Sequence, residues 1–456
     1  MNEWAGKKVA VVGLGISNIS LIRYLAKQNA VISGRDYKLA SELGNRYQTL
    51  KELGVECQLG EDYLADLQDY DAVFLTPGIP KYLPEIQAIK HKVPILSEIS
   101  LVLKQAKAPV FGITGSSGKT TTTTLVGEMV KASGLNCHVG GNIGNPLIEN
   151  IDEIPSEDRI IMELSSFQLE LLDQSPDVAL ITNISENHLD IHLTMDNYIN
   201  AKKQIYLHQK PSDIAIFNYD DSVTFAMSKE AVAQVYYFST KHRVKQGTYL
   251  EKDQLIFQDQ AGLVQIIAKQ DIGLMGEHNV QNILAAALIA HLAGASWQAI
   301  RKVAREFTGV AHRLEKVAVV NQVVYYNDSI ATSPSRTIAG LNAFSQPIIL
   351  IAGGYDKKLS FKNLAEIIGK KVKELILLGA AADKINQEVD LVNSTFTRIH
   401  RVNDLAEAVM LARDLAEPGD VVLLSPACAS YDMYPDFSAR GEHFCKLVHN
   451  MAADRL

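Results

Sequence analysis

The sequence has few of the features that mark secreted or nucleic-acid-binding proteins. It contains only four cysteines, Cys57, Cys137, Cys428 and Cys445, and their spacing matches neither a disulfide framework nor a metal site. We therefore expect reduced thiols in a cytosolic protein. The formal net charge is −8, so the chain lacks the basic footprint that neutralises phosphates. Nucleic acid is not expected as a partner.

Long hydrophobic runs are also missing. The longest, ILAAALIAHLAGA, is too short to cross a bilayer and includes His291, so we interpret it as a buried helix. The first residues, MNEWAGKKVAVVGLG, lead directly into a predicted strand and lack the apolar core of a signal peptide. Tandem repeats and low-complexity tracts are absent as well. These absences predict a cytoplasmic protein without a membrane span.

Short β-rich runs followed by helical periodicity recur along the 456 residues, for example KKVAVVGLG, DAVFLTPG, PVFGITGS, RIIMELSS, VALITNIS and PIILIAGG. This alternation is typical of α/β proteins with parallel sheets, which bind ligands beyond the carboxyl ends of their strands. Strand–glycine starts divide the chain into three predicted domains, residues 1–98, 99–310 and 311–456. Residues 235–275 lack helical periodicity and predict antiparallel strands within the second domain.

The stretch GITGSSGKTT joins an apolar strand to a helical segment, which is the context that a phosphate loop requires. Gly115 and Gly118 allow backbone N–H groups to approach a polyphosphate closely. Lys119 supplies a positive charge to the β- and γ-phosphates, and Thr120 offers a hydroxyl group to Mg²⁺. Ile113 stands where the usual pattern has its first glycine. The alternative interpretation is an ordinary strand–helix turn.

Polar residues beyond the next predicted strands are candidates for a metal site. Glu163 ends the apolar run RIIME, where a carboxylate can hold Mg²⁺ directly or through water, or can simply be solvated. His188 follows the next strand, in TNISENHLDIH, although a histidine in such a place is usually structural. Lys202 and Lys203 lie in the helical segment INAKKQIYLH, where surface lysines are the default.

The segment VAVVGLGISNISLIRYL carries Gly13 and Gly15 after a predicted strand, as dinucleotide-binding domains do. Asn18 occupies the position of the third glycine, and Asp36 follows where a ribose ligand is expected. An NAD site and a nucleotide-diphosphate pocket with fewer contacts are both compatible with these residues. No obvious hydride-transfer site follows them in the sequence.

An ordered series of motifs resembles the Mur ligase family along essentially the whole chain. The motifs are GLGISNISL, LTPGIP, ITGSSGKTTT, GGNIGNPL, MELSSFQLE, ITNISENHLDIH, AKKQIY, GEHNVQNILAA, HRLE, NDSIATSP, AGGYDK and SPACASYDMYPDFSARGEHF. Within the family they are most similar to the ligases that add D-glutamate. The resemblance implies a Rossmann-like nucleotide-sugar domain, a P-loop ATPase-like central domain with a parallel sheet and a small antiparallel part, and a Rossmann-like C-terminal domain.

The resemblance also implies ATP-dependent amide-bond synthesis on the way to peptidoglycan. The carboxylate of UDP-N-acetylmuramoyl-L-alanine takes the γ-phosphoryl group of ATP, and the amine of D-glutamate attacks the resulting acyl phosphate. A pair of Mg²⁺ ions and Lys119 offset the charge that gathers during this transfer. ATP, Mg²⁺ and the two substrates are the expected ligands, and we expect a monomer.

The resemblance assigns site residues by their place in the motifs. The expected catalytic residues are Lys119, Glu163, His188, Lys202 and Asn142. The expected metal ligands are Thr120, Glu163, His188 and Lys202, the last as a carbamate formed with CO₂. The expected ATP contacts are Gly115, Ser116, Ser117, Gly118, Lys119, Thr120, Thr121, Asn279, Asn282, Arg313 and Asp328. The uridine nucleotide is expected at Ile16, Ser17, Asp36, Tyr37, Lys38 and Gly78, and D-glutamate at Thr332, Lys357, Ser430 and Phe437.

Two stretches depart from the family pattern. The family often reads Asp-Ser-Lys-Ala-Thr-Asn, and its lysine helps to bind glutamate or to position the reacting groups, whereas Ile330 stands there in this chain. The glycine loop reads Gly-Gly-Tyr-Asp-Lys, where some members have Gly-Gly-Asp-Gly-Lys. The alternatives are a sister ligase for another amino acid, a folyl-polyglutamate-type synthetase, a P-loop nucleotide switch and an NAD-dependent dehydrogenase.

Overall fold

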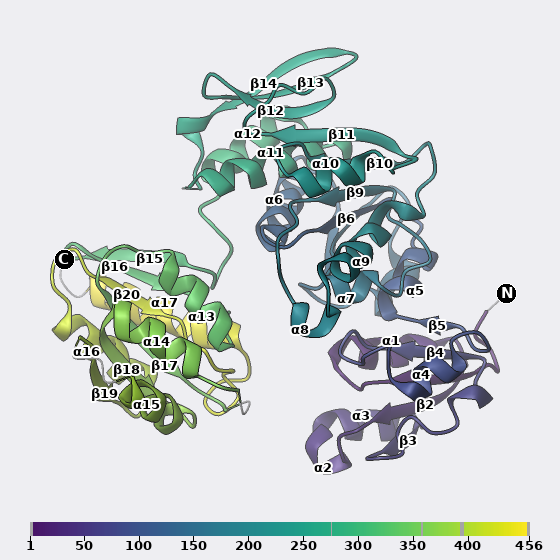
Figure 1. Cartoon of the computed structure of the whole chain (residues 1–456), viewed down its shortest axis with the longest axis horizontal. Helices are drawn as coiled ribbons and strands as arrows, with labels where there is room; N and C mark the ends of the chain where they lie inside the picture. The colour runs from purple at the N-terminus through teal and green to yellow at the C-terminus, as the bar shows by residue number, and fades with distance from the viewer. Residues whose placement is uncertain (1–2, 275, 357–358, 393–395, 454–456) are drawn as a thin grey trace. The chain divides into compact units, whose positions relative to one another are not determined.

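The computed structural model describes residues 3–274, 276–356, 359–392 and 396–453. The chain forms two compact units, Met1–Phe307 and Thr308–Leu456. The first unit holds a five-stranded and a nine-stranded sheet, and the second holds a six-stranded sheet (Figure 1). Within the described ranges, no helix combines the length and apolar character that crossing a membrane requires.

The first sheet is parallel throughout and has the strand order β3-β2-β1-β4-β5. Its elements are β1 (Lys8–Val12), α1 (Ile16–Lys27), β2 (Val31–Asp36), α2 (Ala40–Leu43), α3 (Asn45–Glu52), β3 (Glu56–Leu59), β4 (Ala72–Leu75), α4 (Pro84–Ile89), β5 (Ile95–Leu96) and α5 (Glu98–Gln105). The strand order reverses between β1 and β4, which is where open α/β sheets bind ligands. Gly13 follows β1 at φ 87°, and a Cβ there would lie 2.2 Å from the Thr76 side chain beyond β4.

The second sheet has the order β14-β13-β12-β11-β10-β9-β6-β8-β7. Its elements are β6 (Val110–Thr114), α6 (Lys119–Ala132), β7 (Cys137–Gly141), β8 (Arg159–Glu163), α7 (Ser166–Leu169), β9 (Val178–Ile181), α8 (Leu189–His192), α9 (Met195–Leu207), β10 (Ile214–Asn218), α10 (Ser222–Ser228), β11 (Gln234–Ser239), β12 (Gly247–Glu251), β13 (Gln254–Asp259), β14 (Gly262–Ala268), α11 (Glu277–Leu292) and α12 (Trp297–Glu306).

The prediction of antiparallel strands over residues 235–275 is correct for β12 to β14 and wrong for β11. Strands β12, β13 and β14 pair in antiparallel fashion, but β11 pairs in parallel with both β10 and β12. Helix α10 carries the chain back across the sheet between β10 and β11, and such a crossover produces parallel neighbours. The antiparallel part is therefore an extension of the large sheet.

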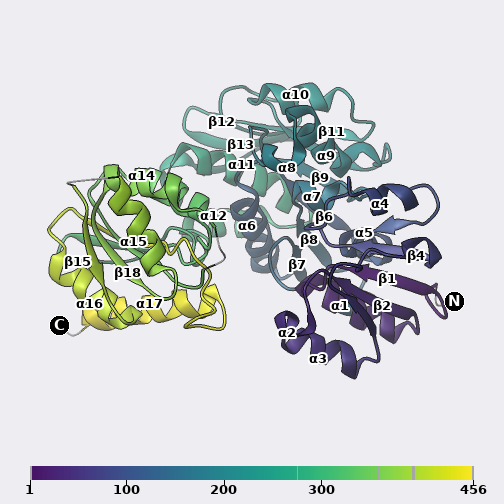
Figure 2. The ribbon, with the colours of Figure 1, turned by 60° about the horizontal axis from the view of Figure 1, so that its bottom comes forward.

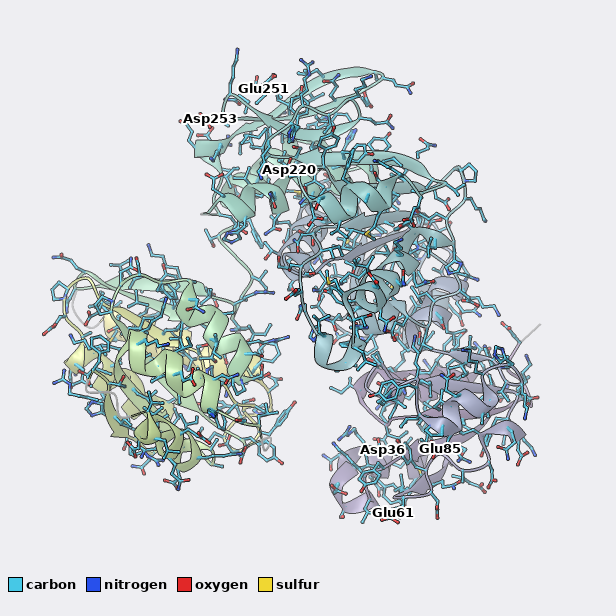
Figure 3. The ribbon with its side chains drawn as sticks, viewed as in Figure 1. Asp36, Glu61, Glu85, Asp220, Glu251 and Asp253 are labelled. Atoms are coloured by element: carbon cyan, nitrogen blue, oxygen red, sulfur yellow. The ribbon has the colours of Figure 1, made fainter. Side chains whose placement is uncertain are left out.

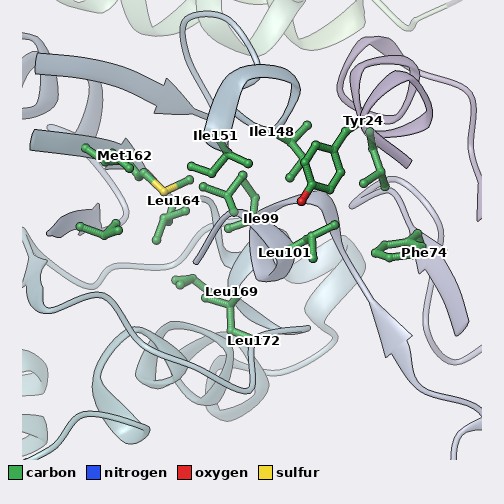
Figure 4. Packing of buried hydrophobic residues seen from close by; sticks show 14 of the residues in the cluster. Tyr24, Phe74, Ile99, Leu101, Ile148, Ile151, Met162, Leu164, Leu169 and Leu172 are labelled. Atoms are coloured by element: carbon green, nitrogen blue, oxygen red, sulfur yellow. The ribbon is translucent and has the colours of Figure 1, made fainter. Parts of the chain in front are cut away.

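Side chains alternate along the buried strands, so each face of the nine-stranded sheet has its own core. Ile113 and Leu180 pack with the helices α6 and α11 on one face, and α11 contains the apolar run that was expected to be a buried helix. Met162 on the other face belongs to a core that extends to Tyr24 and Phe74 of the first sheet (Figure 4). This shared core joins the two sheets within the first unit.

The third sheet has the order β15-β16-β20-β17-β18-β19, and all its pairs are parallel except β15 with β16. Helices α13, α14 and α15 cover one face, and α16 and α17 cover the other. Figure 2 shows α14 on one side of the sheet and α16 and α17 on the other. The elements are β15 (Glu315–Val320), β16 (Val323–Asn327), α13 (Pro334–Asn342), β17 (Ile348–Gly353), α14 (Lys362–Lys371), β18 (Val372–Leu378), α15 (Ala382–Leu391), β19 (Arg398–Arg401), α16 (Leu405–Leu415), β20 (Val421–Leu424) and α17 (Phe437–Ala453).

Glu98 begins α5 inside the shared core and makes the first unit sensitive to pH. Its side chain is buried, and burial raises the pKa of its carboxyl group from 4.5 to about 7, although the Ile148 backbone N–H donates a hydrogen bond to it. The folded state therefore binds this proton more tightly than the unfolded state. The stabilisation is fully present below pH 4.5 and is lost as the pH rises through about 7.

We expect Glu98→Gln to melt at nearly the same temperature as the parent protein at pH 5 and at a higher temperature at pH 8. The pKa difference corresponds to roughly 3 kcal/mol of unfolding free energy. Thermal unfolding at the two pH values measures this, with the exposed Glu128→Gln as the control variant. Equal pH slopes in Glu98→Gln and the parent protein would contradict the assignment.

Candidate active site

The phosphate loop lies between β6 and α6, and β6 lies between β9 and β8 in the nine-stranded sheet. Gly115 and Gly118 have φ angles of 149° and 79°, which side chains rarely allow. A Cβ on Gly115 would lie 1.8 Å from the Thr182 hydroxyl oxygen, and one on Gly118 would lie 2.4 Å from the Asn282 amide oxygen. The loop therefore needs glycine at both positions for conformation and for space.

Hydrogen bonds hold the loop against the segment that follows β9. The Ser117 backbone N–H donates to the Asn183 side chain over 3.0 Å, and the Ser116 hydroxyl lies 2.9 Å from the hydroxyl of Tyr198. Lys119 begins α6, and its Nζ donates to the carbonyl oxygens of Gly115 and Ser116 over 2.9 and 3.2 Å. An ammonium group is thus held at the N-terminus of a helix whose first N–H groups can bind an anion. Thr120 and Thr121 follow in the first turn.

Lys202 is buried beneath this loop, with only 1 % of its surface exposed. Its Nζ donates to the Gly115 carbonyl over 2.9 Å and to the Thr114 hydroxyl over 3.2 Å. Burial, and then the charge of Lys119, hold the pKa of Lys202 well below its usual range. Lys203 instead pairs with the exposed Glu230 over 2.7 Å. The surface-lysine interpretation is therefore wrong for Lys202.

Glu163 ends β8 and is also 1 % exposed. Its Oε1 accepts a hydrogen bond from the Asn142 side chain over 2.8 Å, whereas its buried Oε2 has no hydrogen-bond partner among the residues that the structure describes. A buried carboxylate oxygen without a donor is costly unless a cation meets it. Glu163 therefore fits a divalent cation, with Thr120 as the candidate hydroxyl ligand.

His188 lies at the start of α8, with its backbone at φ 53°, and its ring packs edge-on against Phe167 at 5.2 Å. Among the residues that the structure describes, no three His, Cys, Asp or Glu side chains gather as a metal site. A cation at Glu163 would therefore need hydroxyl, water or modified-lysine ligands besides carboxylate. The role of His188 as a metal ligand stays a prediction.

The first two turns of α11 carry the predicted asparagines, and Asn282 adjoins the phosphate loop. Asn282 is buried against Gly118, and its side chain donates to that of Asn279 over 3.0 Å. Gln281, next to Asn282 in the same helix, donates to the Thr240 hydroxyl over 3.5 Å, and the Thr240 backbone N–H donates to Asp220 (Figure 3) over 2.6 Å. The structure thus brings both predicted asparagines to the loop, while their contact with ATP stays a prediction.

The predicted nucleotide-sugar residues lie at the carboxyl ends of β1, β2 and β4. Ile16 and Ser17 begin α1, and Gly78 lies in the loop after β4. Asp36 (Figure 3) ends β2 and accepts hydrogen bonds from the backbone N–H groups of Leu14 and Lys38 over 2.7 and 2.9 Å. The ring of Tyr37 beside it is largely exposed.

Asn18 explains how this loop keeps its shape without a third glycine. Its side-chain amide is buried and donates to the backbone carbonyls of Val12 and Gly13 over 3.1 and 2.7 Å. The asparagine therefore fills space beneath the loop rather than leaving it open as a glycine would.

In the second unit, Asp328 follows β16 and accepts hydrogen bonds from the Ser425 hydroxyl over 2.7 Å and the Leu314 backbone N–H over 3.2 Å. Burial raises the pKa of Asp328 to about 6. Arg313 is exposed just before β15. The assignment of Arg313 and Asp328 to ATP stays a prediction.

The predicted glutamate residues lie on loops of the second unit. Thr332 follows Asp328 in the same loop, Ser430 is buried beyond β20, and Phe437 begins α17. Lys357 lies outside the described residues. Sequence reasoning missed the buried Arg440, although it lies in the motif SARGEHF.

Arg440 holds these loops together. Its Nε donates to the Ser329 hydroxyl over 3.0 Å, and its terminal nitrogens donate to the carbonyls of Ser329, Cys428 and Ala429 over 2.9 to 3.2 Å. The Ser329 hydroxyl in turn donates to the Phe437 carbonyl over 2.7 Å. Burial lowers the pKa of Arg440 to about 10, so the guanidinium keeps its charge at neutral pH.

Comparison with known proteins places these features in a family. Three family models match the chain: the Mur ligase MurD-like N-terminal domain over residues 7–97, the Mur ligase middle domain over 113–290, and the Mur ligase glutamate ligase domain over 312–428. The UDP-N-acetylmuramoylalanine–D-glutamate ligase of Symbiobacterium thermophilum is 47 % identical over 449 residues, which cover 98 % of each chain. The ligase of that name from a Clostridium botulinum strain is 46 % identical over 98 % of this chain and 97 % of the relative.

Solved structures share the fold at lower identity. The UDP-N-acetylmuramate-alanine ligase MurC of Thermotoga maritima has a TM-score of 0.55 at 19 % identity and covers 98 % of this chain and 100 % of its own. MurF of Acinetobacter baumannii has a TM-score of 0.53 at 19 % identity and covers 82 % of this chain and 88 % of its own. These two likenesses concern the fold alone. The family models together reach from residue 7 to residue 428, and the chain shares nearly half its residues with full-length relatives. The chain therefore belongs to the Mur ligase family.

Proposed function

We propose that the chain is an ATP-dependent ligase that adds D-glutamate to UDP-N-acetylmuramoyl-L-alanine through an acyl phosphate, in cytoplasmic peptidoglycan precursor synthesis. The observation that carries this proposal is the meeting of Lys119 and Lys202 at the Gly115 carbonyl, in a site whose Glu163 has a buried, unpartnered oxygen. Such a site suits the transfer of a phosphoryl group between two anions. The printed names of the full-length relatives support the choice of substrates.

The chemistry assigns a task to each group at the phosphate loop. The backbone N–H groups at the start of α6 bind phosphate oxygens, and Lys119 offsets the charge on the transferring phosphoryl group. Glu163 and Thr120 would hold Mg²⁺, which when bound would stabilise negative charge on the phosphates. Asn142 orients Glu163 through the Oε1 hydrogen bond. His188 and a carbamate on Lys202 are proposed as ligands of a second Mg²⁺.

Substrate binding is assigned to the other predicted residues. We propose that residues 1–98 bind the UDP moiety, residues 99–310 bind ATP, and residues 311–456 bind the amino acid. Carboxylate activation is needed because a free carboxylate is a poor electrophile until one oxygen becomes part of a good leaving group. The amine of D-glutamate then displaces phosphate and forms the amide.

A screen of acceptors tests the substrate assignment. We expect phosphate release from ATP only when UDP-N-acetylmuramoyl-L-alanine and D-glutamate are both present, with L-glutamate, L-alanine, L-lysine and meso-diaminopimelate as comparisons. Phosphate release with the UDP substrate and another amino acid, but not with D-glutamate, would favour a sister ligase. Ile330 raises this alternative. Release without either substrate would favour a nucleotide switch.

Ile330 leaves the acceptor site without the lysine that the family often has there. Arg336 donates to the Ile330 backbone carbonyl over 3.1 Å, so its charge is partly engaged. Lys357 is therefore our candidate for meeting the glutamate carboxylates, because charge-assisted hydrogen bonds are the strong ones. We expect Lys357→Ala to raise the KM for D-glutamate at least about tenfold, since such bonds contribute 1.5–3 kcal/mol.

The KM for ATP should change by less than about twofold in Lys357→Ala, because the proposal assigns Lys357 to the amino acid and not to the nucleotide. Steady-state kinetics with each substrate varied in turn measures both constants. Lys362→Ala, an exposed lysine at the start of α14, is the control. Equal and small changes in the two KM values would show that the acceptor site lies elsewhere.

A further inference from the structure

His192 is a buried histidine in the first unit to which neither its motif nor the proposed chemistry gives a role. It ends α8, and its ring lies between two polar partners from the α7 region. Its Nδ1 lies 3.0 Å from a carboxylate oxygen of Glu170, and its Nε2 lies 2.9 Å from the Ser166 hydroxyl. An ionised carboxylate can only accept, so Nδ1 carries a proton, and in the neutral imidazole Nε2 accepts a hydrogen bond from the serine hydroxyl.

The arrangement of serine, histidine and glutamate resembles a nucleophile with its base and orienting acid. A nucleophile must reach a substrate, however, and Ser166 is only 3 % exposed at the start of α7. The same hydrogen bonds fix the orientation of the imidazole ring about both its nitrogens. The geometry therefore favours a positioning role over a second hydrolytic centre.

The ring of His192 supports residues around the phosphate loop through two aromatic contacts. Phe167 stacks on His192 with ring centroids 4.9 Å apart and the planes 5° from parallel, and its ring also meets that of His188 at 5.2 Å. Tyr198 meets the His192 ring edge-on at 5.3 Å. A change at His192 would therefore reach His188 through Phe167.

Tyr198 connects the same ring to the phosphate loop. Its hydroxyl lies 2.9 Å from that of Ser116, and its ring lies 4.9 Å from the ammonium nitrogen of Lys202. Helices α7, α8 and α9, which carry these residues, lie together below the nine-stranded sheet (Figure 1). The imidazole ring of His192 thus contacts the two aromatic rings that in turn contact Ser116, His188 and Lys202.

An ion pair connects this cluster to the first sheet. Lys81 lies in the loop after β4, three residues beyond Gly78, and its Nζ lies 3.0 Å from Oε2 of Glu170. Glu170 therefore uses one carboxylate oxygen for Lys81 and the other for His192. Burial lowers the pKa of Lys81, while the charge of Glu170 opposes that change.

We propose that His192 is a positioning residue that couples the Lys81 loop to the phosphate loop, through Glu170 on one side and Tyr198 and Phe167 on the other. The proposal rests on the proposed function, because it concerns how the same site is aligned. A substrate nucleotide that fixes the loop around Gly78 also fixes Lys81. Glu170 and His192 then hold the rings that orient Ser116, His188 and Lys202.

Kinetics of matched variants test this coupling. His192→Phe keeps an aromatic ring and loses both hydrogen bonds. We expect kcat to fall about 10- to 100-fold, which is the usual effect of losing a residue that orients the binding side chains of a site. The KM values and the melting temperature should stay close to those of the parent protein. His192→Asn keeps a donor for Glu170 and should recover part of the loss. His208→Phe, an exposed histidine after α9, should be silent.

The double variant distinguishes coupling from independent damage. Lys81→Met should lower kcat several-fold, and adding it to His192→Phe should cost nothing further, because coupled residues are not additive. Lys104→Met, which breaks the exposed pair with Glu3, should have no effect. Multiplied losses in the double variant, or a kcat for His192→Phe within twofold of the parent, would overturn the proposal.

A proton NMR signal separates failure of the coupling from failure of the proposed function. The buried Nδ1 proton of His192 should give a far-downfield resonance that vanishes in His192→Phe and shifts in Lys81→Met but not in Lys104→Met. If the chemical shift of this proton does not change in Lys81→Met, the proposed coupling is wrong, whether or not the variant turns over substrate. A parent protein that shows this resonance but no turnover with D-glutamate would refute the proposed function instead.

Discussion

Lys119→Ala should abolish ligation while the protein stays folded. The ammonium of Lys119 is held over the phosphate loop by the carbonyls of Gly115 and Ser116, at the N-terminus of α6. Negative charge spreads over the transferring phosphoryl group, and a preorganised cation there stabilises the transition state far more than it would in water. We expect kcat/KM for ATP to fall at least about 1,000-fold.

Phosphate release in the presence of both substrates measures this loss. The melting temperature should change by only about 2 °C, because the lysine side chain is only half-buried. Lys131→Ala, on the exposed face of the same helix, is the control and should keep full activity. Near-normal turnover of Lys119→Ala would contradict the assignment of this loop as the site of phosphoryl transfer.

Lys202→Ala should lose most activity and regain part of it with acetate or formate. An amine reacts with CO₂ only when neutral, forming a carbamate anion and releasing a proton. An ordinary lysine, with a pKa near 10.4, offers little neutral amine at pH 7. Burial holds the pKa of Lys202 well below that value, so the neutral form is available. A small carboxylate in the space left by the side chain would replace the carbamate.

Lys203→Ala is the matched control, since Lys203 is the next residue of α9 and pairs with Glu230 at the surface. It should be nearly silent and should not respond to acetate. Mass spectrometry of gently prepared peptides provides a direct readout of the modification. Wild-type activity of Lys202→Ala in CO₂-depleted buffer would show that Lys202 is only a buried structural lysine.

The sequence alone predicted the phosphate loop because its signals are local. Gly115, Gly118 and Lys119 lie within five consecutive residues, and the apolar strand and helical period on either side are equally local. Local sequence signals could not predict that Lys202 is buried. A helical lysine beside another lysine looks solvent-exposed, and its burial follows from the packing of α9 beneath β6.

Long-range contacts account for what sequence reasoning missed. His192 gains its environment from Lys81, Ser166 and Glu170, which lie in two distant segments, and no spacing rule connects them. The parallel pairing of β11 depends on the crossover through α10 rather than on the composition of the strand. The i, i+4 spacing of His188 and His192 was the one local signal that could have drawn attention to His192.

The most direct measurement of the central claim follows an oxygen atom. UDP-N-acetylmuramoyl-L-alanine labelled with ¹⁸O in both carboxylate oxygens is incubated with ATP and D-glutamate, and the released phosphate is analysed by mass spectrometry. If the phosphate loop activates the carboxylate as an acyl phosphate, one ¹⁸O atom leaves with each phosphate and the other stays in the new amide. Phosphate without ¹⁸O would mean that water attacks ATP, and it would contradict the assignment of this chain as a carboxylate-activating ligase.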